Sequence, residues 1–220
     1  MLVLAAHAPE LVGMRAELGD ELAGFVRGLR VVCATVGVGM PVAAAGAMRH
    51  LRDARPRAVV LLGSCGVYPK HDDHALLDLV VPEQIALVDP AVVAGKGAFP
   101  APMQTSLAAD DMLSRGLCGY VPSIHRGTVA TTLAITTDDT MASRLGKRSG
   151  CETENLEAFA VASACAALSL PFAALLSITN VVGSDGRKQW TRYQRRAAEA
   201  SARGLLDWVH RGARGLPARA

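Results

Sequence analysis

Aromatic residues and cysteines are scarce in this sequence. Only 4% of the 220 residues are aromatic, and cysteine occurs five times. The cysteines stand at positions 33, 65, 118, 151 and 165. They form no CxxC pair and have no metal-type spacing with histidine. An odd, scattered set of this kind is typical of reduced thiols in a protein core, so we expect a cytoplasmic protein.

Blocks of one charge and long apolar runs are also missing. The net charge is only +3, and no cluster of Lys and Arg precedes the C-terminal tail, so we expect no nucleic-acid partner. No run of about 18 apolar residues is free of charges, so no membrane span is expected. The apolar start, Met1 to Ala6, has no basic residue and is too short for a signal peptide.

Two familiar glycine motifs are incomplete. Val36 to Pro41 is a glycine-rich turn after a buried strand, but it is not a GxGxxG fingerprint and no acidic residue follows at the expected distance. This excludes a dinucleotide site, and we expect no cofactor. Gly63-Ser64-Cys65-Gly66 differs from the GxSxG elbow because its second glycine comes one residue early. Ser64 is therefore not predicted to be a hydrolase nucleophile.

What remains is a chain in which half of the residues are hydrophobic, enough for one well-cored domain over residues 1–220. Apolar strand patterns alternate with helical ones. Strands are predicted at 1–6, 29–35, 58–62, 76–81, 84–88, 121–132 and 171–178. Helices are predicted at 11–18, 42–51, 138–145, 155–168 and 192–210. This alternation favours an α/β fold with a parallel or mixed central sheet and helices on both faces.

Polar residues stand where several of these strands end. Glu10 follows the first strand, Glu157 lies at the start of an apolar helix, and Thr179-Asn180 ends the last strand. Ligands of open α/β sheets bind at the carboxyl ends of strands, so these residues are candidates for a pocket wall. Each also has a structural explanation, because carboxylates suit helix starts and asparagine suits turns.

Four segments together resemble the nucleoside phosphorylase and nucleosidase superfamily. They are Gly63-Ser64-Cys65-Gly66, Asp78 to Val81, Asn155-Leu156-Glu157-Ala158 and Pro171 to Asn180, in the order and spacing of that superfamily. The resemblance covers nearly the whole chain. It implies a phosphorylase-like three-layer α/β/α sandwich with a central mixed sheet, usually a homo-oligomer, that cleaves the N-glycosidic bond of a nucleoside.

The resemblance implies roles for three residues, which are our expected catalytic set. Glu157 resembles the carboxylate that holds the ribose hydroxyls. Glu10 matches the residue that positions or activates the attacking water in the nucleosidases. Asn180 stands at the purine-facing position, where adenine-cleaving members have an aspartate.

Other positions are expected to contact substrate. Leu156 stands where the family usually has a methionine under the sugar, and Ile135 falls in the segment whose backbone lines the base. The expected substrate-binding set is Ser64, Gly66, Ile135, Asn155, Leu156, Glu157 and Thr179. Phe99 to Met103 matches a loop that in many members caps a neighbouring subunit's site, so we expect a homodimer or higher homo-oligomer with this loop near the interface.

Two departures from the family pattern bear on the reaction. Hexameric phosphorylases have an arginine two residues before the Gly-Ser pair, and here that position is Leu61, which favours water over phosphate as the nucleophile. Asn180 replaces the aspartate that protonates a 6-aminopurine, which points to a 6-oxopurine. The segment Thr179 to Trp190 is similar to one in futalosine hydrolases, which release hypoxanthine on a route to menaquinone. Its Arg187 and Lys188 could face a substrate carboxylate or be a solvated loop.

Several alternatives stay open. A purine nucleoside phosphorylase or a methylthioadenosine/adenosylhomocysteine nucleosidase would remain within the superfamily, whereas a catalytically silent nucleoside-binding relative would be of another class. His7 could donate a proton, but a buried or interface histidine is the favoured interpretation. His71 and His74, with Asp72 and Asp73, resemble a metal cluster; we favour a solvated polar turn and expect no metal.

Overall fold

The computed structural model describes residues 1–71, 73–119 and 124–218. Its helices are η1 (Ala8–Leu11), α1 (Val12–Leu18), α2 (Met40–Ala54), α3 (Pro90–Val93), α4 (Asp111–Cys118), α5 (Asp139–Ser149), α6 (Ala158–Ala167) and α7 (Gly186–His210). Its strands are β1 (Leu2–Ala5), β2 (Ala23–Val26), β3 (Leu29–Thr35), β4 (Val59–Val67), β5 (Leu79–Leu87), β6 (Ser106–Ala108), β7 (Ile124–Thr131), β8 (Thr153–Asn155) and β9 (Phe172–Val181).

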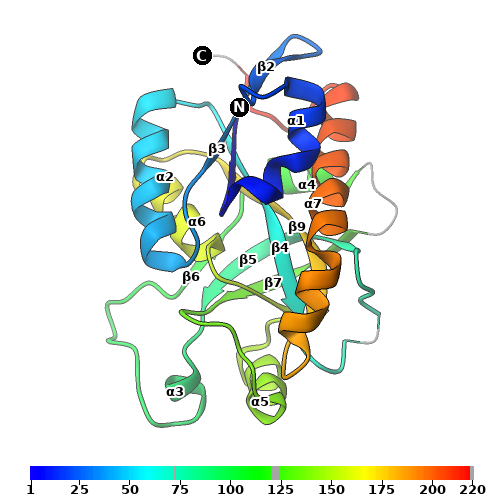
Figure 1. Ribbon diagram of the computed structural model, residues 1–220. Coiled ribbons are helices and arrows are strands. Elements are labelled where there is room, and N and C mark those ends of the chain that lie inside the picture. Colours follow the sequence, from blue (N-terminus) through cyan, green and yellow to red (C-terminus); the bar gives the residue numbers. More distant parts are fainter. Residues whose placement is uncertain (72, 120–123, 219–220) are drawn as a thin grey trace.

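The strands form one mixed sheet with helices on both faces, as Figure 1 shows. Successive side chains of a strand point to opposite faces. In β4, Val59 and Leu61 pack in the core beneath α2 and α6, whereas Val60 and Leu62 pack in the core beneath α1, α4 and α7. Because both faces are buried, β4 is continuously apolar from Val59 to Leu62. The predicted three-layer α/β/α fold with a mixed sheet is confirmed.

The sheet also closes on itself. Strand β4 runs parallel to β9, β9 pairs antiparallel with β5, and β5 pairs in parallel with β7. Strand β7 then pairs with β8, and β8 returns to β4 at Gly66 and Val67. Strands β1 and β3 extend the sheet from β4 in parallel. The carboxyl ends of β1, β3, β4 and β9 therefore share one edge, and the site lies there.

Aspartate caps set the starts of three helices. Asp89, Asp110 and Asp138 accept backbone N–H groups in the first turns of α3, α4 and α5. Such caps satisfy amides that have no partner inside the helix. Within the described residues, no helix is long and apolar enough to cross a membrane.

Some element predictions are wrong. Residues 76–88 contain one strand, β5, with a register shift between Pro82 and Gln84, instead of two. The helix expected from 155 begins at Ala158, because residues 153–155 form β8, and the last helix begins at Gly186 instead of Arg192. Strand β2 and helix α4 were not predicted. The expected strand 121–132 is found as β7, and its residues 121–123 lie outside the described residues.

Candidate active site

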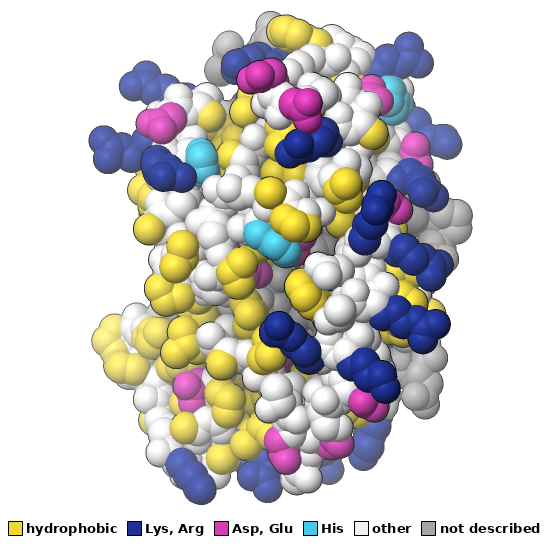
Figure 2. Space-filling model, in the orientation of Figure 1, with side chains coloured by type: hydrophobic (Ala, Val, Ile, Leu, Met, Phe, Trp, Pro, Cys, Tyr) yellow, Lys and Arg dark blue, Asp and Glu magenta, His cyan; other side chains and the backbone are white. Residues whose placement is uncertain are grey.

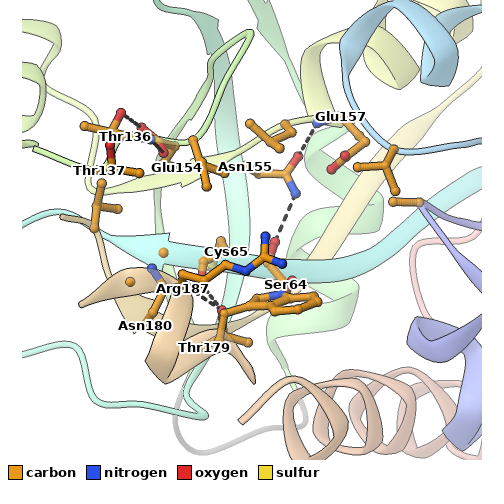
Figure 3. A pocket seen from close by; sticks show the side chains of 18 of the residues that line it. Ser64, Cys65, Thr136, Thr137, Glu154, Asn155, Glu157, Thr179, Asn180 and Arg187 are labelled. Carbon is orange, nitrogen blue, oxygen red and sulfur yellow. Dashed lines mark hydrogen bonds between the residues drawn. The ribbon is translucent and has the colours of Figure 1, made fainter. Parts of the chain in front are cut away.

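A cavity of about 360 Å³ opens at the shared edge of the strands (Figure 3). This volume is within the range of small-molecule sites. All nine site residues predicted from the sequence line it. They are Glu10, Ser64, Gly66, Ile135, Asn155, Leu156, Glu157, Thr179 and Asn180. Segments far apart in the chain are thus brought to a single pocket.

Glu10 is a buried carboxylate held by backbone amides. The Ala6 N–H donates to its Oε2 at 2.9 Å, and the Ser64 N–H donates to its Oε1 at 3.2 Å. The Ser64 hydroxyl lies 3.4 Å from the same Oε1. Pro9 fixes the turn η1 that follows β1 and aims the side chain back toward β4. Glu10 therefore joins the ends of two parallel strands.

Glu157 is the second buried acid of the pocket and is the N-cap residue of α6. Its Oε1 accepts the Gly39 N–H at 2.8 Å. Gly37 and Gly39 have φ values of 99° and 85°, a region that favours glycine, and this turn presents the amide to the acid. Burial raises the pKa of Glu157 to about 7, the Gly39 hydrogen bond lowers it, and the Glu10 charge raises it further. The two acids therefore influence each other across the cavity.

His7 also lines the pocket, and the sequence did not identify it as a site residue. Its Nδ1 is 3.4 Å from Glu10 Oε2, and its ring stacks on Trp190 with the ring centres 6.4 Å apart. The adjacent Glu10 carboxylate is the main cause that raises the His7 pKa. The only sequence signal was its position close to the end of β1.

Asn155 supports the frame of the site. Its Oδ1 accepts the N–H groups of Glu157 and Ala158 at 2.8 and 2.7 Å, and its Nδ2 donates to the Ser64 carbonyl at 3.0 Å. The side chain thus caps α6 and ties it to β4. These bonds, drawn in Figure 3, fix the position of Glu157 relative to Ser64. Leu156, between the two, adds an apolar wall to the pocket.

Thr179 and Asn180 close the pocket at the end of β9. The Thr179 hydroxyl is hydrogen-bonded to Asn180 Oδ1 at 2.8 Å, and Asn180 Nδ2 donates to the Val181 carbonyl at 3.1 Å. A Cβ at Gly66 would lie 2.7 Å from Asn180 Nδ2. Gly66 therefore contributes space for the Asn180 amide.

Glu154 is a buried pocket residue that the sequence did not reveal. It accepts the Tyr68 hydroxyl at 2.9 Å, the Thr136 N–H at 3.0 Å and the Thr136 hydroxyl at 2.6 Å. These bonds hold the loop after β7, including Ile135, against the pocket (Figure 3). The strand that carries Glu154 is only three residues long, so its alternation pattern was too short to recognise.

The first turn of α7 supplies the remaining wall. Arg187 and Trp190 line the pocket, and Figure 3 shows the Arg187 side chain directed into it. Among the described lining residues, Arg187 is the only Lys or Arg. Because α7 begins at Gly186, Arg187 and Lys188 lie on a helix and not on a loop.

The profile of the Phosphorylase superfamily matches residues 11–207, most of the chain. The chain belongs to this superfamily. The membership inferred from the sequence motifs is thereby confirmed. No curated protein sequence matches the chain.

Several solved structures resemble the chain in fold over nearly its full length. A mutant of the Helicobacter pylori methylthioadenosine nucleosidase, with 5′-methylthioadenosine in the active site, is 16% identical with a TM-score of 0.85, covering 96% of this chain and 97% of that one. A futalosine hydrolase mutant of H. pylori also has 16% identity and a TM-score of 0.85, covering 96% and 98%. The Streptococcus pneumoniae methylthioadenosine/adenosylhomocysteine nucleosidase with 8-aminoadenine is 20% identical, with a TM-score of 0.82 and coverage of 95% and 98%.

Within this superfamily fold, Leu61 occupies the position at which the resemblance places the arginine of hexameric phosphorylases. The structure buries Leu61 in the core of β4, away from solvent. An aliphatic side chain offers no donor to an anion. The pocket thus combines three buried acids, a histidine and two amides, a set able to orient water and stabilise positive charge.

Proposed function

We propose that this chain hydrolyses the N-glycosidic bond of a purine nucleoside. The observation that carries the proposal is the meeting of Glu10 and Glu157 in one cavity at the edge of the sheet. Membership in the Phosphorylase superfamily supports it, as does the likeness in fold to nucleosidases. The substrate is a small nucleoside, and neither a cofactor nor a nucleic acid takes part.

In the proposed reaction the bond from the purine nitrogen to C1′ breaks, and its electron pair leaves with the base. The sugar passes through an oxocarbenium-like state. Glu157 holds the ribose hydroxyls and stabilises the positive charge, an effect that is often the largest in catalysis. The water oxygen bonds to C1′ and one of its protons passes to Glu10, which later releases it to solvent, while the departing base takes up a proton from solvent. A general base of this kind typically contributes about 10²- to 10⁴-fold to the rate.

The surroundings of Glu10 support water rather than phosphate. The Ser64 N–H, an obvious donor for an anion at the end of β4, is already bonded to the Glu10 carboxylate. A phosphate dianion placed there would meet the Glu10 carboxylate and would lack the arginine that Leu61 replaces. Like charges at short range disfavour binding, whereas a neutral water is oriented by a carboxylate.

Asn180 supports a preference for 6-oxopurines. Asn180 Oδ1 is hydrogen-bonded to the Thr179 hydroxyl, and one N–H of its Nδ2 group donates to the Val181 carbonyl. The second Nδ2 proton is left to donate to N7 or O6 of the base. An amide has no acidic proton to give to N7 of a 6-aminopurine, so adenine nucleosides are the poorer substrates.

We further propose a futalosine-type substrate, whose release product is hypoxanthine. The segment Thr179 to Trp190 carries this resemblance, and Arg187 supplies a cation in the pocket for a carboxylate on the 5′ side of the sugar. A methylthioadenosine nucleosidase is the second candidate, supported by the likeness of fold to such enzymes. For that candidate, the pocket would have to prefer a substrate with an uncharged 5′ substituent, although Arg187 places a positive charge there.

One assay separates these possibilities. Inosine, adenosine, methylthioadenosine and futalosine are incubated with the protein, with and without phosphate, and free base is measured. We expect release from futalosine or inosine that is independent of phosphate. A strict phosphate requirement would identify a phosphorylase. Binding of nucleosides without turnover of any of them would support a catalytically silent relative.

The base preference has its own test in Asn180→Asp. A protonated aspartate donates to N7 of a 6-aminopurine, so we expect the ratio of kcat/KM for adenosine to that for inosine to rise at least about tenfold, near 1.4 kcal/mol. Asn180→Ala is the control, since it removes the amide without adding an acid and should lower both rates without raising this ratio. An unchanged ratio in Asn180→Asp would remove Asn180 from base recognition.

We also propose that residues 1–220 act as one domain within a homo-oligomer. The pocket is built from segments spread between Ala6 and Trp190, so no short part of the chain contains it. Hydrophobic side chains gather on one side of the surface, below α2 and toward the loop that includes Phe99 to Met103 (Figure 2). Val38 and Ile135, two exposed hydrophobic residues, line the pocket itself. A second copy on this face would shield the pocket mouth.

A further inference from the structure

The loop between β4 and β5 contains a cluster of histidines and carboxylates away from the pocket. His71, Asp73 and His74 each offer a ligand atom, and these atoms lie within 4.8 Å of one another. The sequence suggested a solvated polar turn here. That interpretation is wrong for His74, whose side chain is only 4% exposed. Asp72 lies outside the described residues.

The buried His74 ring has a carboxylate at each nitrogen. Its Nδ1 lies 3.0 Å from Asp73 Oδ1, and its Nε2 lies 3.5 Å from Glu152 Oε2. No described residue hydrogen-bonds to Nε2, although that atom is buried. A neutral imidazole has one N–H and one lone pair. If Nδ1–H donates to Asp73, the Nε2 lone pair faces the Glu152 carboxylate, and if Nε2–H points to Glu152, the Nδ1 lone pair faces Asp73. In either tautomer one lone pair faces a carboxylate, which is repulsive without a cation there.

The neighbours of His74 hold its ring in this orientation. The His74 ring stacks on His125 with centres 3.9 Å apart and planes 18° apart, and His125 is itself fixed by Asp78 at 2.8 Å. The Glu152 carboxylate sits where a Cβ at Gly127 would overlap it, so the glycine makes room for this acid. A carboxylate behind a histidine is a usual way in which proteins orient a metal-binding imidazole, and Glu152, 29% exposed, is placed to do so.

We propose that His71, Asp73 and His74 bind a divalent transition metal, with Zn²⁺ as the expected ion. Two imidazoles and one carboxylate form a donor set suited to zinc, cobalt or nickel and poorly suited to magnesium or calcium. Bonds of about 2.0–2.1 Å place tetrahedral ligands roughly 3.3–3.5 Å apart. His71 is only partly buried, on a loop, so rotation of its side chain closes the remaining distance. Water completes the coordination.

The metal would brace the loop beneath the pocket and take no part in the chemistry. The Tyr68 N–H donates to the Glu152 carbonyl at 2.8 Å, and the Tyr68 hydroxyl donates to Glu154. Glu152 and Glu154 thus lie on one short segment, the first behind the metal ligands and the second in the pocket wall. A bound ion would fix the connection from β4 to β5 against β8. This inference does not depend on the proposed reaction.

The test is a titration of tag-free, chelator-treated protein with Co²⁺, followed by visible absorption and by displacement with Zn²⁺. We expect one ion per chain. His71→Ala should abolish one-to-one binding, and Glu152→Gln should weaken it about 10- to 100-fold. His50→Ala is the matched control, because His50 lies on α2 and contacts the Thr35 carbonyl. Metal binding by this variant should equal that of the wild type. His71 is partly exposed, so its replacement leaves the core intact.

A second measurement is the unfolding temperature with and without Zn²⁺. Binding to the folded state alone raises the wild-type Tm by roughly 2–6 °C, and the rise should be absent in His71→Ala. The proposal is overturned if the wild type takes up neither ion at micromolar concentration. It is overturned equally if His71→Ala binds as tightly as His50→Ala.

Discussion

At the scale of single residues, Glu10 is held so that its charge is available to the cavity. Its oxygens accept the Ala6 and Ser64 amides, which keep the carboxylate in place between β1 and β4. A glutamine in this position can accept only one of the two, because its NH₂ group is a donor. Glu10→Gln therefore removes both the base and part of the frame.

We expect Glu10→Gln to lower kcat about 10²- to 10⁴-fold with little change in KM, since the residue acts on water and not on the nucleoside. Unfolding curves should show a retained fold with a loss of about 1–3 kcal/mol for the unpaired amide. Glu17→Gln is the control, because Glu17 contacts only His210, at 3.5 Å, among its charged partners that the structure describes. A normal kcat in Glu10→Gln would exclude Glu10 as the base.

Glu157 links stability to pH. Its ordinary pKa is 4.5, and burial raises it to about 7 in the folded protein. Between these values the folded state binds a proton that the unfolded state has lost, so the free energy of unfolding falls as pH rises through this window. A shift of one pKa unit corresponds to about 1.4 kcal/mol, so the free energy of unfolding falls by roughly 3 kcal/mol across the window.

Glu157→Gln should remove this dependence. The glutamine oxygen can still accept the Gly39 N–H, but no buried charge forms at high pH. We expect the variant and the wild type to have similar unfolding free energies near pH 5, and the variant to be the more stable above pH 8. Denaturant unfolding at both pH values measures the difference. An offset of the same size at both would contradict the raised pKa. Activity should be nearly lost in the variant at either pH.

The sequence predicted polar residues at or near the ends of strands and missed the pocket residues Glu154 and His7. Glu10, Thr179 and Asn180 stood out because polar residues interrupt an apolar run, and the structure places them at one cavity. Glu154 and His7 act through contacts with residues distant in the sequence or on a three-residue strand. No local pattern reports such contacts, since they arise from tertiary packing.

At the scale of elements, the close approach of α2 to the strand β3 depends on one glycine. A Cβ at Gly46 would overlap the carbonyl oxygen of Val36, directly after β3. This contact brings the start of α2, and with it the Gly39 amide, up to Glu157. Only a residue without a side chain allows helix and backbone to lie this close.

Gly46→Ala should therefore destabilise the protein, although alanine is the better helix former by about 1 kcal/mol. Overpacking of this kind costs roughly 1–3 kcal/mol, and it should exceed the gain. Ala45→Gly, on the exposed face of the same helix, measures propensity alone and should cost about 1 kcal/mol. Denaturant midpoints give both values. A stabilised Gly46→Ala would show that α2 can shift without cost.

Element prediction succeeded where periodicity was long. Strands β3, β4 and β9 and helix α2 show apolar patterns over seven or more residues and were found, with ends that differ by a few positions. Strand β8 has three residues and strand β2 has four, and neither produced a signal. The first turn of α7 was missed because Gly186 and its neighbours resemble a turn, although tertiary contacts make them helical.

At the scale of the whole molecule, the site exists because the sheet closes. Strand β8 bridges β7 and β4, which places Glu154 and Asn155 beside Ser64 and Gly66. This pairing is between segments distant in the sequence, so neither composition nor alternation could predict it. The resemblance to the superfamily supplied the fold, whereas the residues alone supplied only a mixed sheet with helices on both faces.

Exposed hydrophobic residues on the surface lead to a prediction about the oligomeric state. Leu133 is 69% exposed and Met103 is 44% exposed, whereas positively charged side chains cover the α7 side of the view in Figure 2. Large apolar patches on one face mark association surfaces. We expect the wild type to be a dimer or larger in light scattering, and Leu133→Asp and Met103→Asp to shift it toward the monomer.

The same substitutions should raise KM, because the apolar residues Val38 and Ile135 lie at the pocket mouth and a partner subunit would shield them. Met112→Asp is the matched control: Met112 is also 69% exposed but lies on α4, on the other face of the sheet. The Met112→Asp variant should have the same assembly mass in light scattering and the same KM as the wild type. A monomeric wild type, or a control that dissociates as readily as Leu133→Asp, would remove the apolar face from the account of assembly and leave the pocket complete within one chain.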